Sequence, residues 1–177
     1  NGKLNTKDLL IDESFFQQKS KFKIKKAIFT CNMDYKFDNS VNMKSLKNFS
    51  INKGICKSNN SVISGIDVTN IITKVDNVNT FQDFFNLFNL KKIGGDTQLE
   101  TAFFRFKLSN NRLSVSDFET RNEVVEIKSF GDYNIISKDL NADNKISLKT
   151  KKFPSLPNFS VFLNGNLENY KVTYDFD

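Results

Sequence analysis

The side chains of this chain that could perform chemistry are few and widely spaced. The sequence contains no histidine, which removes the usual general base, the commonest metal ligand and every Ser-His or Cys-His arrangement for nucleophilic catalysis. Asp139, Asp143 and Asn144 stand close together but lack the glycine and the terminal glutamate of a calcium-binding loop, so we interpret them as turn formers. The sequence therefore predicts a protein that is not an enzyme and that has no cofactor or metal.

The two cysteines are a second candidate for chemistry. Cys31 and Cys56 are too few for a disulfide framework and wrongly spaced for a metal cluster. They fall in neighbouring predicted strands. Two interpretations stay open: a disulfide between them, or two reduced thiols at half-buried strand positions.

A β-hairpin is predicted for the segment 94–119. Apolar and basic residues alternate from Phe104 to Leu108, a turn follows at Ser109-Asn110-Asn111, and the alternation resumes. Residues 1–9 match residues 110–118 without a gap, so that Asp8 aligns with Asp117. A carboxylate that recurs in a repeat is more often a structural partner than a catalytic group. The repeat itself predicts a sheet extended by similar strands.

Further strands are predicted wherever apolar residues alternate between clusters of turn residues. A change of phase at Lys25-Lys26 predicts a bulge. Turns are expected at residues 58–60, around which 51–57 and 61–64 would form a hairpin, and also at 131–132 and 141–144. The expected strands are 4–12, 22–31, 33–37, 41–49, 51–57, 61–64, 124–130, 133–137, 145–149, 159–163 and 170–174.

Two helices are expected in one insertion, at about residues 67–92. Asp67 can cap the first, which would run to about Val75, and Thr80 opens the second. The second carries an aromatic stripe, expected to pack on the sheet, of Phe81, Phe84, Phe85 and Phe88. The predicted fold is mostly β (α+β): a curved antiparallel β-meander or open groove with a short two-helix insertion.

Length and composition fit one domain over residues 1–177. No apolar run is long enough to span a membrane. The net charge of +6 comes mostly from lysine, and we attribute it to an AT-rich genome rather than to a functional basic surface. Because the chain begins with Asn1, inside a copy of the repeated motif, we expect it to be a segment of a longer protein.

The hairpin and its flanks resemble the C-terminal region of the AsmA-like family of bacterial envelope proteins. Residues 49–55 and 62–68 upstream, and 156–167 and 170–175 downstream, agree with the family pattern. Asn111 replaces the usual turn glycine, Asn169 stands where proline is common, and the 131–132 pair lacks a second glycine. The family's Gly-Gly-x-Thr, aromatic strand, turn and Leu-x-x-x-Asp are carried by Gly94, Gly95, Thr97, Phe103, Phe104, Asn110, Asn111, Leu113, Asp117 and Phe118.

This resemblance implies an elongated periplasmic β-sheet groove that carries phospholipid or another envelope lipid from the inner toward the outer membrane. It also implies an inner-membrane anchor in an N-terminal segment not contained in this chain, so that membrane contact would come from other parts of the parent protein. Other envelope proteins would be partners. A periplasmic location would permit Cys31 and Cys56 to oxidise.

One apolar face along successive strands is the candidate binding site. The sequence alone leaves open whether this face is an ordinary core or a lipid-lined groove, and the family resemblance favours the groove. The candidate groove residues are Phe104, Phe106, Leu108, Val125, Ile127, Ile146, Leu148, Phe159, Val161 and Leu163.

Three classes of function predict different surfaces. A lipid conduit requires an exposed apolar concave face. A structural or assembly factor for outer-membrane biogenesis, acting through protein partners, requires a covered face and exposed strand edges. A nucleic-acid module requires basic residues clustered among exposed aromatics, whereas here lysine is scattered and the aromatics occupy buried-type positions. Nucleic acid is therefore not an expected partner.

Overall fold

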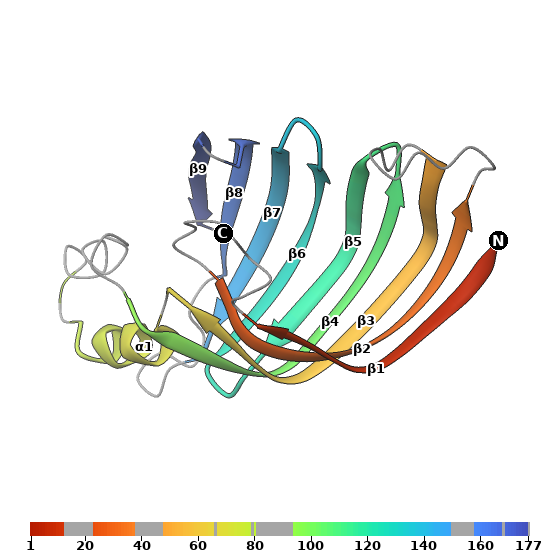
Figure 1. The fold of residues 1–177 in the computed structure, drawn as a ribbon. Helices are drawn as coiled ribbons and strands as arrows, with labels where there is room; N and C mark the ends of the chain where they lie inside the picture. The colour runs from red at the N-terminus through yellow and green to blue at the C-terminus, as the bar shows by residue number, and fades with distance from the viewer. Residues whose placement is uncertain are drawn as a thin grey trace.

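The described residues of the chain form one antiparallel sheet of nine strands. The structure is a computed structural model that describes residues 1–12, 23–37, 48–65, 67–78, 80, 94–149, 158–167 and 169–176. Each strand pairs with its neighbours in sequence, in the order β1 to β9, and Figure 1 shows that the sheet curves strongly. The strands are β1 (Gly2–Asp12), β2 (Lys23–Phe37), β3 (Phe49–Ser64), β4 (Asp96–Ser109), β5 (Arg112–Arg121), β6 (Val125–Asn134), β7 (Asp139–Leu148), β8 (Phe159–Asn166) and β9 (Asn169–Phe176).

The predicted hairpin is confirmed as β4 and β5, with Ser109 paired to Arg112. Asn110 and Asn111 between them have φ angles of 50° and 62°. Two consecutive residues with positive φ form a type I′ turn, whose twist matches that of the flanking strands. Asparagine tolerates this conformation better than most residues do, which explains why Asn111 can stand in place of glycine.

The internal repeat is matched by a repeated β-bulge. Between the pairs Thr6–Cys31 and Leu9–Phe29, β1 advances by three residues while β2 advances by two. Between Val115–Gly131 and Phe118–Ser129, β5 likewise advances by three residues while β6 advances by two. Thr6 and Leu9 are the repeat counterparts of Val115 and Phe118. The two copies therefore bend at the same place, because an extra residue on one strand increases the local twist.

The bulge predicted at Lys25-Lys26 is also present, since the register of β2 against β3 shifts on both sides of Lys26. Residues 33–37, expected as a separate strand, continue β2. The 41–47 part of the expected strand at 41–49 lies outside the described residues.

The hairpin expected around residues 58–60 was wrong. β3 runs unbroken through this segment and keeps its pairing with β4 from Asn59–Thr101 to Ser61–Leu99. Asn60 does adopt a φ of 58°, but it forms a bulge opposite β2, where β3 advances by three residues from Asn59 to Val62 and β2 by two. Long-range pairing on both sides of β3 overrides the local turn signal.

The turns expected at residues 131–132 and 141–144 were also wrong. β6 runs through Gly131 and β7 runs through Asn144; the two are joined by a turn at residues 135–138. A Cβ added at Gly131 would overlap the backbone of Asn141 and Ala142. The glycine therefore permits close approach of β7 rather than a change of direction.

Of the two expected helices, the structure describes one, so the predicted two-helix insertion is not supported. Helix α1 (Val68–Asp76) begins after Asp67, whose Oδ1 accepts a hydrogen bond of 2.9 Å from the N–H of Asn70, as an N-cap does. The N–H of Val68 donates to Thr97 Oγ1 at 3.0 Å and ties the helix to β4. The phenylalanine stripe at residues 81–88 lies outside the described residues.

Candidate functional site

The pairing register places all ten candidate groove residues on one face of the sheet. Directly paired residues point to the same side, and so do residues two apart along a strand. Val68 and Ile72 of α1 pack on this side against Val125, Leu148 and Phe159. We call it the inner face. One row of paired residues, followed from β3 to β8, is Cys56, Phe104, Phe118, Ser129, Asn144 and Val161.

Four rows of paired residues cross all nine strands on the inner face. None of their positions carries Lys, Arg, Asp or Glu, although charged residues make up 26% of the chain. Along these four rows the inner face is therefore uncharged from one edge of the sheet to the other. Row 1 is Gly2, Tyr35, Ile51, Leu108, Leu113, Tyr133, Leu140, Gly165 and Tyr170. Row 2 is Leu4, Met33, Gly54, Phe106, Val115, Gly131, Ala142, Leu163 and Val172. Row 3 is Thr6, Cys31, Cys56, Phe104, Phe118, Ser129, Asn144, Val161 and Tyr174. Row 4 is Leu9, Phe29, Ser58, Ala102, Thr120, Ile127, Ile146, Phe159 and Phe176.

Burial of the inner face is uneven. Close to α1 the side chains are shielded, and Val125 is only 1% exposed. From β4 to β8 the side chains of rows 2 and 3 are mostly half-buried. Of the ten candidates, four are buried, namely Leu108, Val125, Leu148 and Phe159. The other six are half-buried: Phe104, Phe106, Ile127, Ile146, Val161 and Leu163. The helix thus covers one end of the face and leaves the middle partly accessible.

A disulfide joins Cys31 of β2 to Cys56 of β3 within row 3, where the two residues are directly paired. Their side chains are 4% and 3% exposed. Next to them the rings of Phe29 and Phe104 meet edge to face, with their centroids 5.7 Å apart. The disulfide and these rings belong to one hydrophobic cluster that spans β2 to β4.

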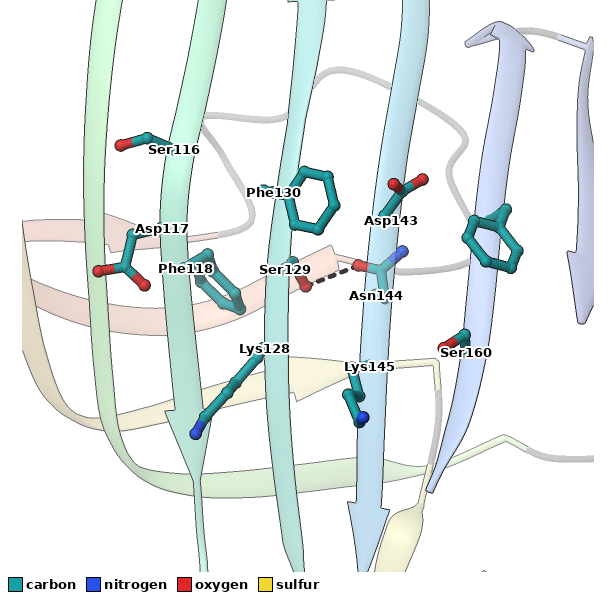
Figure 2. A pocket seen from close by; sticks show the side chains of 11 residues that line it. Ser116, Asp117, Phe118, Lys128, Ser129, Phe130, Asp143, Asn144, Lys145 and Ser160 are labelled. Carbon is teal, nitrogen blue, oxygen red and sulfur yellow. Dashed lines mark hydrogen bonds between the residues drawn. The ribbon is translucent and has the colours of Figure 1, made fainter. Parts of the chain in front are cut away.

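The serine, threonine and asparagine side chains of the four rows bond to other side chains or to the backbone. Ser129 Oγ donates to Asn144 Oδ1 at 2.7 Å (Figure 2), and Asn144 Nδ2 donates to the carbonyl of Val161 at 2.9 Å. Thr120 Oγ1 donates to the carbonyl of Thr101 at 2.8 Å. Among the described residues no buried side-chain nitrogen or oxygen lacks a hydrogen-bond partner. These groups therefore add little polarity to the face.

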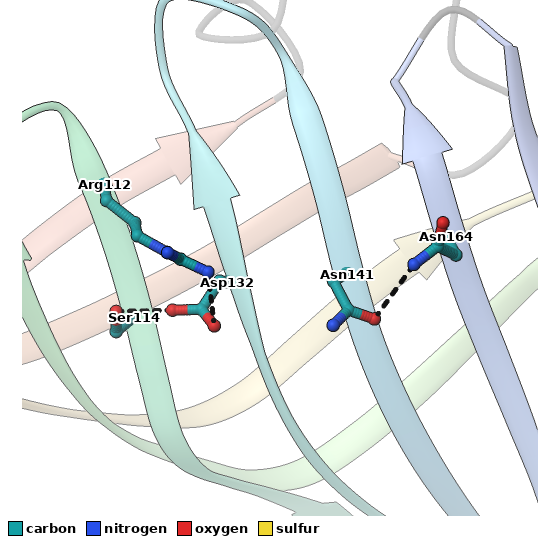
Figure 3. Close-up of polar contacts among 5 residues, drawn as sticks. All are labelled: Arg112, Ser114, Asp132, Asn141 and Asn164. Atoms are coloured by element: carbon teal, nitrogen blue, oxygen red, sulfur yellow. Dashed lines mark hydrogen bonds and ion pairs between the residues drawn. The ribbon is translucent and has the colours of Figure 1, made fainter.

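The outer face carries the charges. Arg105 pairs with Asp117 at 3.1 Å, and Arg112 with Asp132 at 3.2 Å. Ser114 Oγ also donates to Asp132, and Asn164 Nδ2 donates to Asn141 Oδ1 at 3.4 Å (Figure 3). The two faces of the sheet thus differ in charge: the outer face carries ion pairs, and the four rows of the inner face carry none.

The paired carboxylates of the repeat are not brought together. Asp8 lies in the bulge of β1, and Asp117 on β5 accepts a hydrogen bond from Arg105 on β4. Three strands separate β1 from β5. Within the described ranges, no three His, Cys, Asp or Glu side chains gather where they could hold a metal ion.

A shallow hollow of about 360 Å³ opens between β5 and β8. Figure 2 shows Lys128 and Phe130 on β6 beside Asp143 and Lys145 on β7, all at outer-face positions. Lys128 lies 2.9 Å from Glu126. That hydrogen bond lowers the pKa of the Glu126 carboxyl and raises the pKa of Lys128. The ammonium is therefore already partnered, and the hollow does not form a built anion site.

Several inner-face residues were missed by the sequence analysis. Leu113, Val115 and Phe118 do not follow one simple alternation, because the bulge in β5 changes the phase between Val115 and Phe118. Tyr133 and Leu140 were assigned to segments next to expected turns. The signal that could have revealed Leu113, Val115 and Phe118 is the change in the apolar alternation next to Asp117, the residue that aligns with Asp8 in the repeat.

Comparison with known proteins identified no relative of this chain. No family model, curated protein or solved structure matches the chain. In the part of the chain that the structure describes, no helix is long and apolar enough to cross a membrane.

Proposed function

We propose that the inner face is an open groove that binds the acyl chains of phospholipid or another envelope lipid, and that the chain is a non-enzymatic segment of a periplasmic conduit between the inner and outer membranes, of the AsmA-like kind. The observation that carries this proposal is the absence of charge from four rows of paired residues across nine strands. A core needs only enough apolar surface to bury its own elements. An uncharged surface that continues to both sheet edges suits a longer apolar ligand.

The energetics suit acyl chains. Each methylene removed from water contributes about 0.8 kcal/mol, so a surface without charged groups can hold a long chain by contact alone. The half-buried side chains of Phe106, Ile127 and Leu163 retain apolar area that a ligand could cover. The serine, threonine and asparagine side chains of the face are already bonded within the protein. The headgroup of a lipid would therefore remain outside, where lysine side chains can lie along apolar surface and bring their ammonium groups to the phosphate.

The disulfide supports an extracytoplasmic location. Disulfides persist in oxidising compartments such as the bacterial periplasm and are rare in the cytosol. Cys31 and Cys56 are the only cysteines and are joined to each other. We propose that this segment works in the periplasm and that the parent protein is anchored in the inner membrane through residues outside this chain.

The experiment that tests the proposal places charge in the groove. Phe106→Asp combined with Ile127→Asp is expected to weaken the binding of a fluorescent fatty acid, and to reduce phospholipid detected by native mass spectrometry of the parent protein purified from the envelope. Both side chains are half-buried, so we expect the double variant to keep a cooperative thermal transition.

Two control variants show what a charge does on the outer face and in the buried core. Phe130→Asp changes a side chain that is 58% exposed on the outer face and should leave fatty-acid binding unchanged. Val125→Asp places a charge at a fully buried site and should unfold the chain. If the groove variant unfolds as Val125→Asp does, or binds the fatty acid as well as the parent does, the inner face is a core and the proposal is wrong.

A second function, assembly through protein partners, has one observation in its favour. Within the described residues, β1 and β9 each pair on one side only. Such edges accept a strand from another protein. Binding of an envelope protein that is lost on substitution along an edge, but kept in the groove variant, would identify this function.

A further inference from the structure

We propose that the turn between β6 and β7, residues 135–138, inserts Ile135 and Ile136 into the interfacial layer of a lipid bilayer. Ile136 is 64% exposed, the highest value among the large apolar side chains that the structure describes, and Ile135 is 37% exposed. We call residues 135 and 136 the tip. This inference concerns contact of the protein with a membrane and does not depend on what the inner face binds.

The tip is presented by a fixed backbone. Asn134 Oδ1 accepts hydrogen bonds from the N–H groups of Ile136 and Ser137, at 2.9 and 3.0 Å. The N–H of Ile135 donates to the carbonyl of Asn111 in the neighbouring β4–β5 turn at 2.8 Å. An asparagine that accepts from the backbone two and three residues later holds a turn in place. The exposure of both isoleucines is therefore part of the folded turn.

The surroundings of the tip have the layered polarity of a membrane interface. Figure 1 shows the β6–β7 turn at the upper edge of the sheet. Directly below it, on the inner face, row 1 carries Tyr133 and Leu140 and ends at Tyr170. Tyrosine is enriched at the level of lipid headgroups because it combines an apolar ring with a polar hydroxyl. With the tip inserted, the isoleucines would lie in the apolar part of the interface and the tyrosines of row 1 at the level of the headgroups, which is the order found in a bilayer.

The outer side below the tip is polar. A hollow of about 430 Å³ there is lined by Arg112, Asp132, Asn134, Asp139, Leu140, Asn141, Asn164 and Gly165. Figure 3 shows Arg112 paired with Asp132 in it. These amide, guanidinium and carboxylate groups would face headgroups and water at this depth.

The small area of the tip argues for a bilayer over a protein partner. A stable protein interface removes about 800 Å² from each partner, far more than two isoleucine side chains provide. A bilayer needs no complementary shape, and each fully inserted isoleucine is expected to strengthen partition roughly tenfold.

The absence of tryptophan from the chain permits a direct test. Ile136→Trp makes the tip the only tryptophan, and its emission should shift to shorter wavelength when phosphatidylcholine vesicles containing phosphatidylglycerol are added. Phe130→Trp, at a similarly exposed outer-face site, is the matched control and should not shift. A vesicle-independent shift that grows with protein concentration would mean self-association through the tip and would overturn the proposal.

A loss-of-contact variant completes the test. Ile135→Ser with Ile136→Ser should reduce co-sedimentation with these vesicles by at least roughly tenfold, with an unchanged melting temperature, whereas Phe130→Ser should not. Unchanged co-sedimentation of the tip variant overturns the inference. Fatty-acid binding by the inner face, measured without vesicles, should be equal in both variants, so failure here is distinguishable from failure of the groove proposal.

Discussion

The ring of Phe106 in β4 lies against Gly54 in β3, so closely that a Cβ added at position 54 would overlap ring atoms. The two residues are directly paired in row 2 of the inner face. Gly54 is buried although it has no side chain, because the ring covers its backbone. The position of the phenylalanine thus depends on the glycine beside it.

Gly54→Val is therefore expected to displace the Phe106 ring and to destabilise the fold by about 1–3 kcal/mol, as overpacking typically does. Denaturant unfolding measures the change. Gly94→Val is the matched control, because nothing lies within 4 Å of a Cβ added there. Equal midpoints for the two valine variants would contradict the proposed contact.

The disulfide should contribute strongly to stability. It links residues 25 positions apart in sequence, and closing a loop of this size stabilises a fold by about 2–4 kcal/mol, mainly through the unfolded chain. Cys31→Ala with Cys56→Ala should lower the melting temperature accordingly. Adding dithiothreitol should destabilise the parent and leave the double variant unaffected; a reductant effect of equal size on both would mean that the reagent acts elsewhere.

An ion pair ties the bulge of β2 to the start of β4 and predicts a pH dependence. Lys25 Nζ lies 2.6 Å from Asp96 Oδ2, and this hydrogen bond, with one from Ser64, lowers the pKa of the Asp96 carboxyl. A lowered carboxyl pKa in the folded state adds stability above the unfolded pKa of about 4, and this contribution is lost as the pH falls through the folded pKa.

Asp96→Asn should therefore reduce stability slightly at pH 7, and the reduction should shrink as the pH falls below about 4 and the Asp96 carboxyl of the parent becomes protonated. Because both side chains are partly exposed, added salt should shrink the difference at pH 7. Chemical denaturation at several pH values measures it. A difference that persists undiminished in acid would assign the effect to packing instead.

Local signals predicted the parts of the fold that depend on neighbouring residues. The paired asparagines at 110 and 111 specify a type I′ turn by their own conformation, and Asp67 caps α1 through its own carboxylate. Asn60 and Gly131 carry equally strong turn signals. They instead form a bulge and a close strand approach, because the strands on either side hold their segments extended. Only tertiary pairing distinguishes these outcomes.

In the candidate site, too, local sequence signals predicted some features and tertiary pairing decided the others. Alternation within a strand was enough to place ten residues on one face, since none of the predicted runs carries the extra residue of a bulge. It could not extend that face through β5, where the phase changes between Val115 and Phe118, nor through β3, which was divided by the expected hairpin. The degree of burial was also beyond the sequence, because α1 covers Val125 and Phe159 but not Phe106.

The last prediction concerns the edge strand β1. Its repeat counterpart β5 pairs on both sides, with β4 and β6, whereas β1 pairs only with β2 in the described part of the sheet. Leu4, Leu9 and Leu10 are 47%, 40% and 48% exposed along it. An edge strand that exposes apolar side chains is a template for further pairing, so we expect the chain to dimerise through β1 in an antiparallel manner.

Sedimentation velocity over a range of concentrations should detect this dimer, and Leu4→Lys with Leu9→Lys should shift it toward monomer. Tyr170→Lys with Tyr174→Lys on the opposite edge strand β9 is the matched control and should not. A peptide with the sequence of β4, residues 96–109, should compete, because β4 occupies the place beside β5 that is empty beside β1 in the described sheet. If the parent stays monomeric at high concentration and its β1 amides on the free edge exchange slowly with solvent, that edge is already protected within the chain, and β1 is not a site of strand addition.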